Sequence, residues 1–594
     1  SYEAVGNVST MLGKPDAAPS TKPLFSAVEF QKFLDDKVDG VRMSTAGSPP
    51  PDFPTHAQSS FGSFQPCSEQ AISQLIRASA AKSCDLDPMP TFIVKECVDD
   101  LSPFMTRMCN ASISEGCFPA SQKESIVIPA LKKHDLDPME MKNYRPISNL
   151  AFTSKLVEKV VFSQLSGYLA DNNLWPKLQS GFRQFHSTES AVLKVVSDIC
   201  AAVDQGNVAL LALLDVSAAF DTVDHAIMLH RLSQSYGVSG SALDWFRSFV
   251  TGRSQTVKLG STSSPSTLVR FGVPQGSVLG PLLYVLYTAD VIQLVQSLNM
   301  SVHVYADDTQ LYGFAKPSDT VDLSSRIIST IEAVSAWMAS NRLRLNQDKT
   351  QFLWFGSALQ LAKRDSQVLS AVCPALLALT SARDLGVILD SDLSFDKHVS
   401  KLSQSCYFQL RRLRTIRTSL SPAALHTLVH AFVCSRLDFC NSSLYGVKAS
   451  TVDRLQSIFN AAARLLLNVS KFAHISAAIR DTLHWLPVKQ RIEFRTSLLV
   501  RNCLVGSAPD YLRELCVPVA TNEYRRKTRA SDRGDLIVPR VRTERFGRRG
   551  FSVAGPYLWN TLPVDVRRLA TSSSLLAFKR ALKTYLFSQQ TRHF

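Results

Sequence analysis

The chain has 594 residues, of which 45% are apolar and 19% charged. This composition is typical of a globular protein with roughly three to five domains. No apolar run is long enough to span a bilayer, no secretory signal opens the chain, and its 12 cysteines include no C-x-x-C pair. We therefore expect reduced thiols, no membrane segment, and a location in the nucleus and cytoplasm. Because the sequence begins with Ser1, we treat it as a candidate fragment whose true start lies upstream.

The net charge of +15 is unevenly distributed along the chain. Residues 401–594 contain 32 Lys and Arg against 11 Asp and Glu, a net charge of +21, whereas the first 400 residues carry −6. A basic C-terminal third joined to a mildly acidic front predicts a polyanionic partner, most simply nucleic acid. The alternative is a solvated basic surface that has no partner.

The first predicted element is a helix over residues 29–42, because apolar residues recur there at helical spacing. One face of this helix carries Phe30, Leu34, Val38 and Val41. The stretch that follows is rich in Pro and Ser and ends near Pro66. This composition predicts a linker.

Helical and strand-like patterns alternate from about residue 67 to 360, which predicts a mixed α/β domain. Residues 395–500 are mostly helical in pattern. The segment 523–549 has ten Lys and Arg and four acids, and we expect it to be irregular until it meets a partner. Residues 551–587 form a predicted terminal module with Trp559 and a final amphipathic helix.

Three carboxylates are predicted to meet at one end of a sheet. The apolar run 208–214 fits a buried strand that ends at Asp215. Downstream, apolar residues flank Asp307 and Asp308, so both acids fall at the tip of a predicted hairpin. If the hairpin pairs beside the first strand, the three acids converge. A single acidic turn is more often only a solvated turn.

Such a cluster is costly unless cations neutralise it, because like charges so close resist joint ionisation. Two Mg²⁺ ions, roughly 3.5–4 Å apart and held by carboxylate oxygens, are the natural solution, with Mn²⁺ as an alternative. One ion would lower the pKa of a primer 3′-hydroxyl and the other would stabilise the pyrophosphate leaving group. The acids therefore predict a nucleotidyl transfer site.

The acids lie within a larger set of ordered motifs. The motifs are NYRPISNL (143–150), LQSGFRQFHSTESAVLKV (178–195), LLDVSAAFDTVDH (213–225), GVPQGSVLGPLLY (272–284), YADD (305–308), LRLNQDKTQFLWFG (343–356) and DLGVILDSDLSF (384–395). This set resembles the reverse transcriptases of non-LTR, LINE-type retrotransposons and, more distantly, those of group II introns. The resemblance covers roughly residues 70–480 and rests on several independent motifs.

The resemblance implies an α/β (α+β) right-hand polymerase with fingers, palm and a helical thumb. The implied divisions are an N-terminal helix and linker (1–66), an N-terminal extension of the polymerase (67–130), fingers and palm (131–360), primer grip and thumb (361–500), and a basic nucleic-acid-binding region (501–594). The implied activity is RNA-directed DNA synthesis with two Mg²⁺ ions. Its implied partners are an RNA template, a DNA primer or target, and deoxynucleoside triphosphates.

The resemblance also assigns roles at the metal site. Asp215, Asp307 and Asp308 are the implied metal ligands, assisted by the backbone carbonyl of Val216. Lys349 matches the lysine proposed to protonate or neutralise the departing pyrophosphate. The alternative for a lone lysine is plain surface charge. Asp221 and Asp224 are interpreted as structural.

Further residues are implied to bind the nucleotide. Phe220 matches the bulky residue beneath the incoming sugar, where its ring would exclude a ribose 2′-hydroxyl. Gly276 would let the backbone approach closely, and the Gln275 amide would hydrogen-bond substrate or template. Arg183 matches a fingers arginine that reaches the triphosphate. The alternatives are a core role for Phe220 and a surface role for Arg183.

The basic C-terminal region is predicted to contact nucleic acid. The candidate phosphate-binding residues are Arg525, Arg526, Lys527, Arg529, Arg548 and Arg549. Four aromatic residues flank this basic run and could stack on unpaired bases, namely Tyr524, Phe546, Phe551 and Tyr557. The alternative is that they pack within the terminal module, which is the interpretation favoured for Tyr557.

A second possible metal site lies at His426, His430, Cys434 and Cys440. The first three recur every four residues, but apolar residues between them make the same stretch a predicted buried helix. Three ligands along two turns of one straight helix do not close a tetrahedron easily. We therefore interpret the segment as a core helix of the thumb.

No endonuclease is recognisable. Residues 1–66 lack the Asp/His/Asn pattern of an apurinic-type nuclease, and no zinc knuckle follows the polymerase motifs. We therefore expect an element of the apurinic-type clades whose nuclease portion is absent from this chain. The alternative functions are a catalytically silent, retroelement-derived nucleic-acid-binding protein and an RNA-dependent RNA polymerase. Phe220 and the YADD context disfavour the RNA-dependent RNA polymerase.

Overall fold

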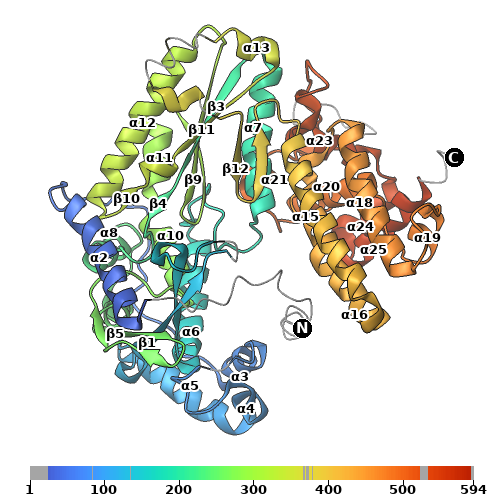
Figure 1. The fold of residues 1–594 in the computed structure, drawn as a ribbon. Helices are drawn as coiled ribbons and strands as arrows, with labels where there is room; N and C mark the ends of the chain where they lie inside the picture. Colours follow the sequence, from blue (N-terminus) through green and yellow to red (C-terminus); the bar gives the residue numbers. More distant parts are fainter. Residues whose placement is uncertain are drawn as a thin grey trace.

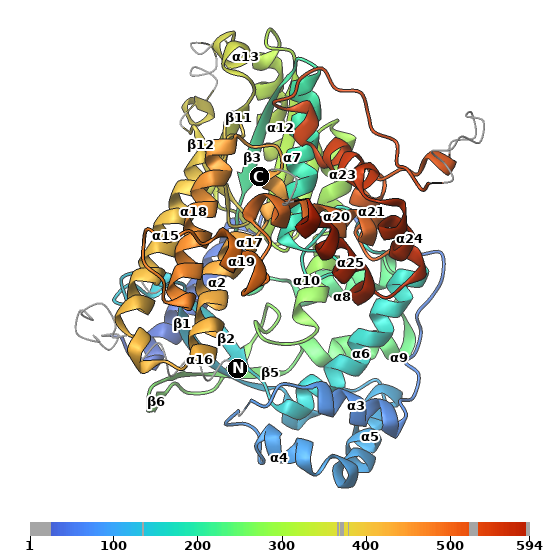
Figure 2. The ribbon, with the colours of Figure 1, turned by 90° about the vertical axis from the view of Figure 1, so that its right-hand side faces the viewer.

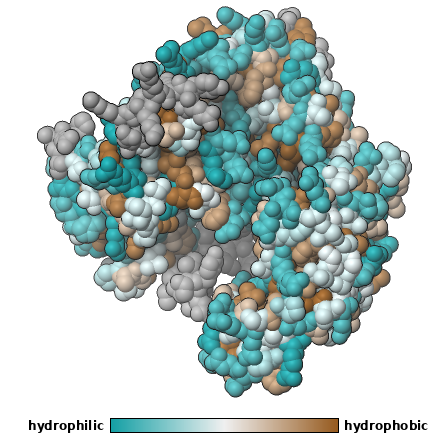
Figure 3. Space-filling view, turned by 180° about the vertical axis from the view of Figure 1, so that it is seen from behind, coloured by the Kyte–Doolittle hydropathy of each residue, from teal (hydrophilic) through white to brown (hydrophobic). Residues whose placement is uncertain are grey.

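A computed structural model describes residues 25–589 apart from 83, 134–135, 365–367, 369–372, 378 and 522–532. It has a mixed α/β part followed by a helical C-terminal part, which lies to the right in Figure 1. Among these described residues, no helix is both long and apolar enough to cross a membrane. Seen from behind, hydrophilic side chains cover most of the surface, and apolar ones form separate small patches (Figure 3).

The central sheet is antiparallel and has four strands in the order β11-β3-β9-β8. Its strands are β3 (Val208–Leu214), β8 (Ser301–Tyr305), β9 (Asp308–Ala315) and β11 (Gln351–Phe355). Alternate residues of β3 point to opposite faces, so Leu210 packs into one hydrophobic core and Leu211 into another. Helices α11 (Asp290–Ser297) and α12 (Thr320–Ser340) cover one face, and α7 (Thr188–Asp204) covers the other. Burial on both faces explains why β3 is uninterruptedly apolar.

A second sheet has the strand order β2-β1-β5-β6, with β7 paired to β5. Its strands are β1 (Glu124–Leu131), β2 (Tyr144–Asn149), β5 (Arg253–Leu259), β6 (Thr262–Ser263) and β7 (Thr267–Val269). Helix α2 (Ala27–Thr45) packs on this sheet, where Phe30 and Leu34 meet Val127 and Val257. The helix predicted over 29–42 is therefore confirmed, and its apolar face explains its position.

The segment predicted as a linker is fixed along the protein surface. The backbone N–H of His56 donates to the carbonyl of Ser235 at 3.0 Å, and that of Phe61 donates to the carbonyl of Gly237 at 2.9 Å. Phe64, near its end, is buried in the main core. Its aromatic residues anchor it despite its Pro-rich composition.

Further helices surround the two sheets. They are α3 (Glu69–Ala78), α4 (Thr91–Glu96), α5 (Val98–Ser114), α6 (Phe152–Asp171), α8 (His225–Gln234), α9 (Gly240–Val250), α10 (Gly280–Tyr287) and α13 (Ala358–Ala362). Short pairs also form between β4 (Val216–Ser217) and β10 (Arg344–Leu345), and between β12 (Ser381–Asp384) and β13 (Val387–Asp390). The helices and the β4–β10 pair enclose the main core beneath the central sheet, whereas β12 and β13 contribute to the second core.

The C-terminal part is helical, as the pattern over 395–500 predicts. Its main helices are α15 (Asp396–Thr415), α16 (Pro422–Val429), α17 (Ser435–Asp438), α18 (Ala449–Leu467), α19 (Ser476–Asp481) and α20 (Val488–Leu504). The stretch with the possible zinc ligands runs as α16, a π-helical turn over His430–Cys434, and α17. Leu425, Leu428 and Val433 bury it in the second core, as predicted for a core helix.

The last elements form a C-terminal module, defined as residues 501–589. It contains α21 (Asp510–Arg513), α23 (Phe551–Thr561), α24 (Val564–Ser572) and α25 (Leu575–Ser588). Helix α7 lies between the central sheet and this module (Figures 1 and 2). Asp204 at the end of α7 accepts hydrogen bonds from the backbone N–H groups of Arg542 and Thr543 at 2.9 and 2.6 Å. Residues 533–546 form no helix and only an isolated bridge at Leu536, so the irregular backbone predicted for 523–549 is confirmed for these described residues, and Asp204 of α7 fixes part of it.

Candidate active site

The three predicted acids lie together at one end of the central sheet. Asp215 directly follows β3, and Asp308 begins β9, which pairs with β3 through Leu214 and Thr309. Asp307 belongs to the turn that joins β8 to β9. The convergence predicted from the apolar run and the hairpin is thus present, because the hairpin pairs beside β3.

A buried glutamine holds the acidic turn. Ala306 has φ = +57°, a conformation that costs a non-glycine residue energy and needs support. The Gln179 side-chain Oε1 accepts from the Ala306 N–H at 2.8 Å, and its Nε2 donates to the Ala306 carbonyl at 3.2 Å. At Gly181, an added Cβ would lie 2.3 Å from the Ala306 nitrogen. Both residues belong to the 178–195 motif, but neither was among the site residues predicted from the sequence.

Crowding and burial disfavour the charged state of these acids. Burial, then the nearby Asp307 and Asp215, raise the pKa of Asp308 to about 6. Burial and Asp215 raise the pKa of Asp307 as well. The Lys349 Nζ lies 3.0 Å from Asp215 Oδ2 and supplies one compensating charge. This charge does not offset burial and mutual repulsion, since the pKa values of Asp307 and Asp308 both remain raised.

The donor set fits divalent magnesium or manganese. The available ligands are hard carboxylate oxygens, and raised pKa values mark carboxylates that a cation would stabilise. Across the described ranges, no three His, Cys, Asp or Glu side chains already form a ligand set for one ion. Here Lys349 occupies one oxygen of Asp215. Asp215, Asp307 and Asp308 would therefore have to draw closer around a bound ion.

Phe220, five residues after Asp215, is half-buried. Its ring stacks on the buried Tyr284 ring at 4.6 Å, with Phe182 edge-on at 6.3 Å. This packing fixes the orientation of the Phe220 ring. Both interpretations from sequence remain compatible with this position, because one face of the ring packs and the residue is still partly accessible.

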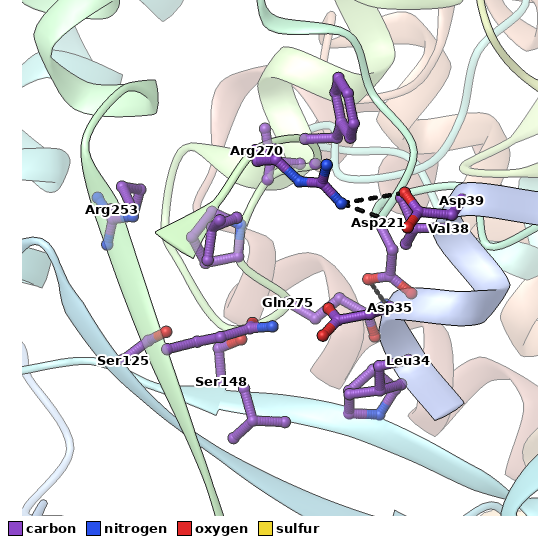
Figure 4. Close-up of a pocket in the computed structure, with 18 residues that line it drawn as sticks. Leu34, Asp35, Val38, Asp39, Ser125, Ser148, Asp221, Arg253, Arg270 and Gln275 are labelled. Carbon is purple, nitrogen blue, oxygen red and sulfur yellow. Dashed lines mark hydrogen bonds and ion pairs between the residues drawn. The ribbon is translucent and has the colours of Figure 1, made fainter. Parts of the chain in front are cut away.

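Gln275 and Gly276 join the active-site region to the second sheet. The backbone N–H of Ser148 donates to the Gln275 carbonyl at 2.9 Å. Gly276 has φ = +141°, and an added Cβ would lie 2.2 Å from the Ser148 oxygen, so only glycine fits. The Gln275 amide donates to Asp221 at 2.8 Å beside a pocket under α2 (Figure 4). Asp221 thus orients Gln275, in agreement with its structural interpretation.

The structure does not bring Arg183 to the acids. Its Nη1 donates to the carbonyls of Pro176 and Gln179 at 2.6 and 3.1 Å, and its guanidinium lies 5.2 Å from the centre of the Trp175 ring. Arg183 therefore organises the loop that carries Gln179. In this conformation its guanidinium forms hydrogen bonds within the protein.

Two other cations, which were not predicted from the sequence as site residues, face the acids. Arg145 on β2 is exposed, and its charge lowers the pKa values of Asp307 and Asp308 against the effect of burial. Lys132, just beyond β1, interacts electrostatically with Asp215. The β1–β2 pairing places Ala130 opposite Arg145, so both cations come from one end of this hairpin. The NYRPISNL motif contained the available signal for Arg145.

The C-terminal candidates separate into three groups. Arg525, Arg526, Lys527, Arg529 and Tyr524 lie outside the described residues. Arg548 is exposed. Arg549 is buried with its guanidinium 5.5 Å from the Phe395 ring centre, which argues against the phosphate-binding role predicted for it.

The aromatic candidates Phe546, Phe551 and Tyr557 differ in their exposure to solvent. Phe546 and Phe551 are buried in hydrophobic cores, so they cannot stack on bases. Tyr557, which was expected to pack near Trp559, is 51% exposed. The interpretation of Tyr557 was wrong because on α23 the two residues point to different sides: Trp559 packs inward against Phe578, and Tyr557 faces outward.

The chain matches known proteins over this region. Residues 131–389 match the family described as reverse transcriptase (RNA-dependent DNA polymerase). The RNA-directed DNA polymerase from mobile element jockey of Drosophila funebris is 26% identical over 62% of this chain and 40% of its own length. The probable RNA-directed DNA polymerase from transposon X-element of Drosophila melanogaster is 27% identical over 70% of this chain and 45% of its own.

A third relative comes from another element of the same fly. The putative 115 kDa protein in type-1 retrotransposable element R1DM of Drosophila melanogaster is 26% identical over 55% of this chain and 31% of its own length. The chain therefore matches less than half the length of each of these relatives.

Proposed function

The chain belongs to the reverse transcriptases of non-LTR retrotransposons, and on this premise we propose that it copies RNA into cDNA from the 3′-hydroxyl of a DNA primer. The observation that carries the proposal is the convergence of Asp215, Asp307 and Asp308 at one end of the central sheet. Two-metal nucleotidyl transfer needs such a set of carboxylates, held rigidly and short of positive charge.

The proposed division follows the right-hand arrangement of polymerases. Residues 131–360 would supply fingers and palm, with the central sheet as the palm and the β1–β2 hairpin in the fingers. Residues 361–500 would supply primer grip and thumb, and 67–130 the N-terminal extension. All 12 cysteines are free thiols, which suits work in the reducing cytoplasm and nucleus.

Asp215, Asp307, Asp308 and the Val216 carbonyl would hold the ions. Bound Mg²⁺ or Mn²⁺ would lower the pKa of the primer hydroxyl and stabilise charge on the leaving pyrophosphate. Lys349 has a side chain that is 61% exposed, so its ammonium is free to turn from Asp215 toward that pyrophosphate. There it would neutralise charge or donate a proton.

The nucleotide would lie between the acids and the fingers. Arg145 and Lys132 are the proposed triphosphate contacts, because their charges already act on the acids in this conformation. Phe220, fixed by Tyr284, would exclude a ribose 2′-hydroxyl. Gly276 would let the backbone approach the nucleotide, and Gln275 would meet the template or the sugar.

The C-terminal module would add a second contact with the template. A groove of about 1050 Å³ is lined by residues of the module together with residues of the thumb helices α18 and α20. Its lining combines aromatic rings with cations, namely Tyr445, Tyr557, Tyr585, Lys448, Lys489 and Arg548. Rings that stack on bases and cations that meet phosphates suit single-stranded RNA.

One assay tests the proposed function. Purified protein is incubated with Mg²⁺ and either poly(rA) primed by oligo(dT) with dTTP, or the same template primed by oligo(U) with UTP. Extension with dTTP but little with UTP is expected. Preferred use of UTP would indicate an RNA polymerase. RNA binding without any extension would indicate a catalytically silent nucleic-acid-binding protein.

A further inference from the structure

One tyrosine of the C-terminal module contacts the β8–β9 hairpin, whose turn contains Asp307. Tyr511 on α21 is 4% exposed. Its hydroxyl lies 2.7 Å from the Ser180 Oγ and donates to the Ser190 Oγ of α7 at 2.9 Å. A residue of the module therefore forms hydrogen bonds deep inside the part of the chain that matches the reverse transcriptase family.

Ser180 connects this hydroxyl to the strand that leads into the acidic turn. The Ser180 N–H donates to the Val304 carbonyl on β8 at 2.8 Å, and its Oγ lies 2.9 Å from the Nε2 of His303. His303 is fully buried, and its ring lies edge-on to Tyr511 at 4.9 Å. The Ser180 side chain thus bridges the module and β8.

The residues on both sides of Ser180 support Ala306 directly. Gln179 hydrogen-bonds the N–H and the carbonyl of Ala306, and Gly181 leaves room for its backbone. Ala306 precedes Asp307. A shift of residues 179–181 would therefore displace Ala306 and, with it, Asp307.

The hydroxyl of Tyr511 has a role that its ring alone could not fill. A phenylalanine would fill the same space, but Ser180 and Ser190 would each lose a buried partner. Unsatisfied buried polar groups are costly, and satisfied buried networks fix one arrangement of the elements they join. The remaining nitrogen of His303, Nδ1, has no hydrogen-bond partner within the described ranges. Ser180 is therefore the only described hydrogen-bond partner of this ring, so a loss at Ser180 would leave the buried His303 without one.

We propose that the C-terminal module is part of the catalytic unit and that Tyr511 is a positioning residue that holds Asp307 in register through Ser180 and Gln179. The proposal rests on the proposed polymerase function for its kinetic consequence. Its structural consequence is independent of that function. Removing the Tyr511 hydroxyl should loosen the acidic turn while the surrounding cores remain packed.

The test uses the full chain with the substitution Tyr511→Phe. Steady-state extension on primed poly(rA) should show kcat reduced about tenfold and KM for dTTP within about twofold of wild type, because small misplacements of a reacting group mainly slow the chemical step. Hydrogen exchange of the peptide covering 302–309 should become faster. Peptides from α12, which supports the opposite face of the sheet, should exchange as in wild type.

Two further variants separate positioning from general destabilisation. Ser180→Ala should reproduce the Tyr511→Phe effects, and the double variant should be little worse than either single one, because both remove the same connection. Tyr236→Phe is the matched control, since Tyr236 is also buried and its hydroxyl bonds only weakly, to the Leu286 carbonyl at 3.4 Å. It should leave kcat and exchange over 302–309 unchanged.

The outcomes are distinct. If wild-type protein has no polymerase activity, the proposed function fails, yet faster exchange at 302–309 in Tyr511→Phe still supports the positioning role. Wild-type exchange at 302–309 in Tyr511→Phe would overturn the proposal. So would additive losses in the double variant, or faster exchange spread equally over all peptides.

Discussion

Positive charge serves different purposes at the acidic end of the central sheet and in the C-terminal module. At the sheet, the pKa values of Asp307 and Asp308 stay raised although three cations act on the acids, and Lys349 is mostly exposed. In the module, Arg567 pairs with Asp535 in a nearly buried ion pair, and Arg545 pairs with Asp392 of the preceding part. The acidic end therefore needs cations from solution. Part of the basic excess of the module forms ion pairs within the protein, so net charge overstates the surface that a polyanion could contact.

The largest expected effect comes from removing an acid. Asp215→Asn should reduce extension by roughly a thousandfold or more, because the loss of a metal ligand removes several kcal/mol of transition-state stabilisation. Circular dichroism should show an unchanged fold. Gln347→Ala, an exposed neighbour of Lys349 on the same short 3-10 helix, is the control and should extend normally. Near-normal activity in Asp215→Asn would remove this acid from the metal site.

The next largest effect is expected at Gly181, which packs against the backbone of the acidic turn. Gly181→Ala should lower kcat about a hundredfold, because its Cβ would lie 2.3 Å from the Ala306 nitrogen and displace the turn. Gly167→Ala, on α6 with open space around it, is the matched control and should be neutral. Equal activity of the two variants would show that the turn tolerates displacement.

Sugar selection should respond to Phe220 alone. Phe220→Val should raise ribonucleotide incorporation relative to deoxynucleotide incorporation by about tenfold, since it relieves contact with one hydroxyl. The ratio of kcat/KM for UTP and dTTP on the same primed template measures this. An unchanged ratio with lower overall activity would identify Phe220 as a packing residue, consistent with its contact to Tyr284.

The charge deficit at the sheet predicts a pH dependence of stability without divalent ions. The folded-state pKa of Asp308, about 6, lies above its ordinary value of 3.8, so the folded protein holds an extra proton between these values. The associated stabilisation is complete below about pH 4 and is lost as pH rises through 6. Tm measured in EDTA from pH 4 to 7 should show this decline, and Asp308→Asn should flatten it. An identical decline in both proteins would contradict the shift.

The smallest expected effect concerns the groove of the module. Arg548→Ala should weaken binding of single-stranded RNA about two- to threefold and reduce the salt slope of binding by roughly one, because one phosphate contact is lost. Arg567→Ala, which removes the same charge from a buried pair, should leave the slope unchanged while lowering Tm. Equal slopes in wild type and Arg548→Ala would mean that the groove does not bind nucleic acid.

Contacts between residues that are close in the sequence could be predicted, whereas contacts between distant residues could not. The apolar run before Asp215 and the alternation around Asp307 and Asp308 specify a strand and a hairpin within a few residues, and their pairing then brings the acids together. Gln179 was not recognised because its partner, Ala306, lies 127 positions away. Tyr511 and Ser180 are 331 positions apart. Only the folded chain brings such pairs into contact.

In the C-terminal module, composition led to wrong predictions of exposed residues for a related reason. A basic run with few acids resembles a solvated surface, but Arg549 and Phe546 are buried because they pack against Phe395 and against residues near α7. The Pro-rich segment before Pro66 likewise resembles a free linker, although His56 and Phe61 are fixed to the surface. In both cases the partner elements lie far away in the sequence.

We propose that Asp215, Asp307 and Asp308 form the metal site of an RNA-directed DNA polymerase. Single-nucleotide incorporation of dTMP on primed poly(rA), measured at increasing Mg²⁺ for wild type and Asp307→Asn, tests it most directly. Wild type should extend the primer with saturable dependence on Mg²⁺, and Asp307→Asn should be folded but inactive at every concentration. Comparable extension by the two proteins, or extension by wild type in EDTA, would contradict the assignment.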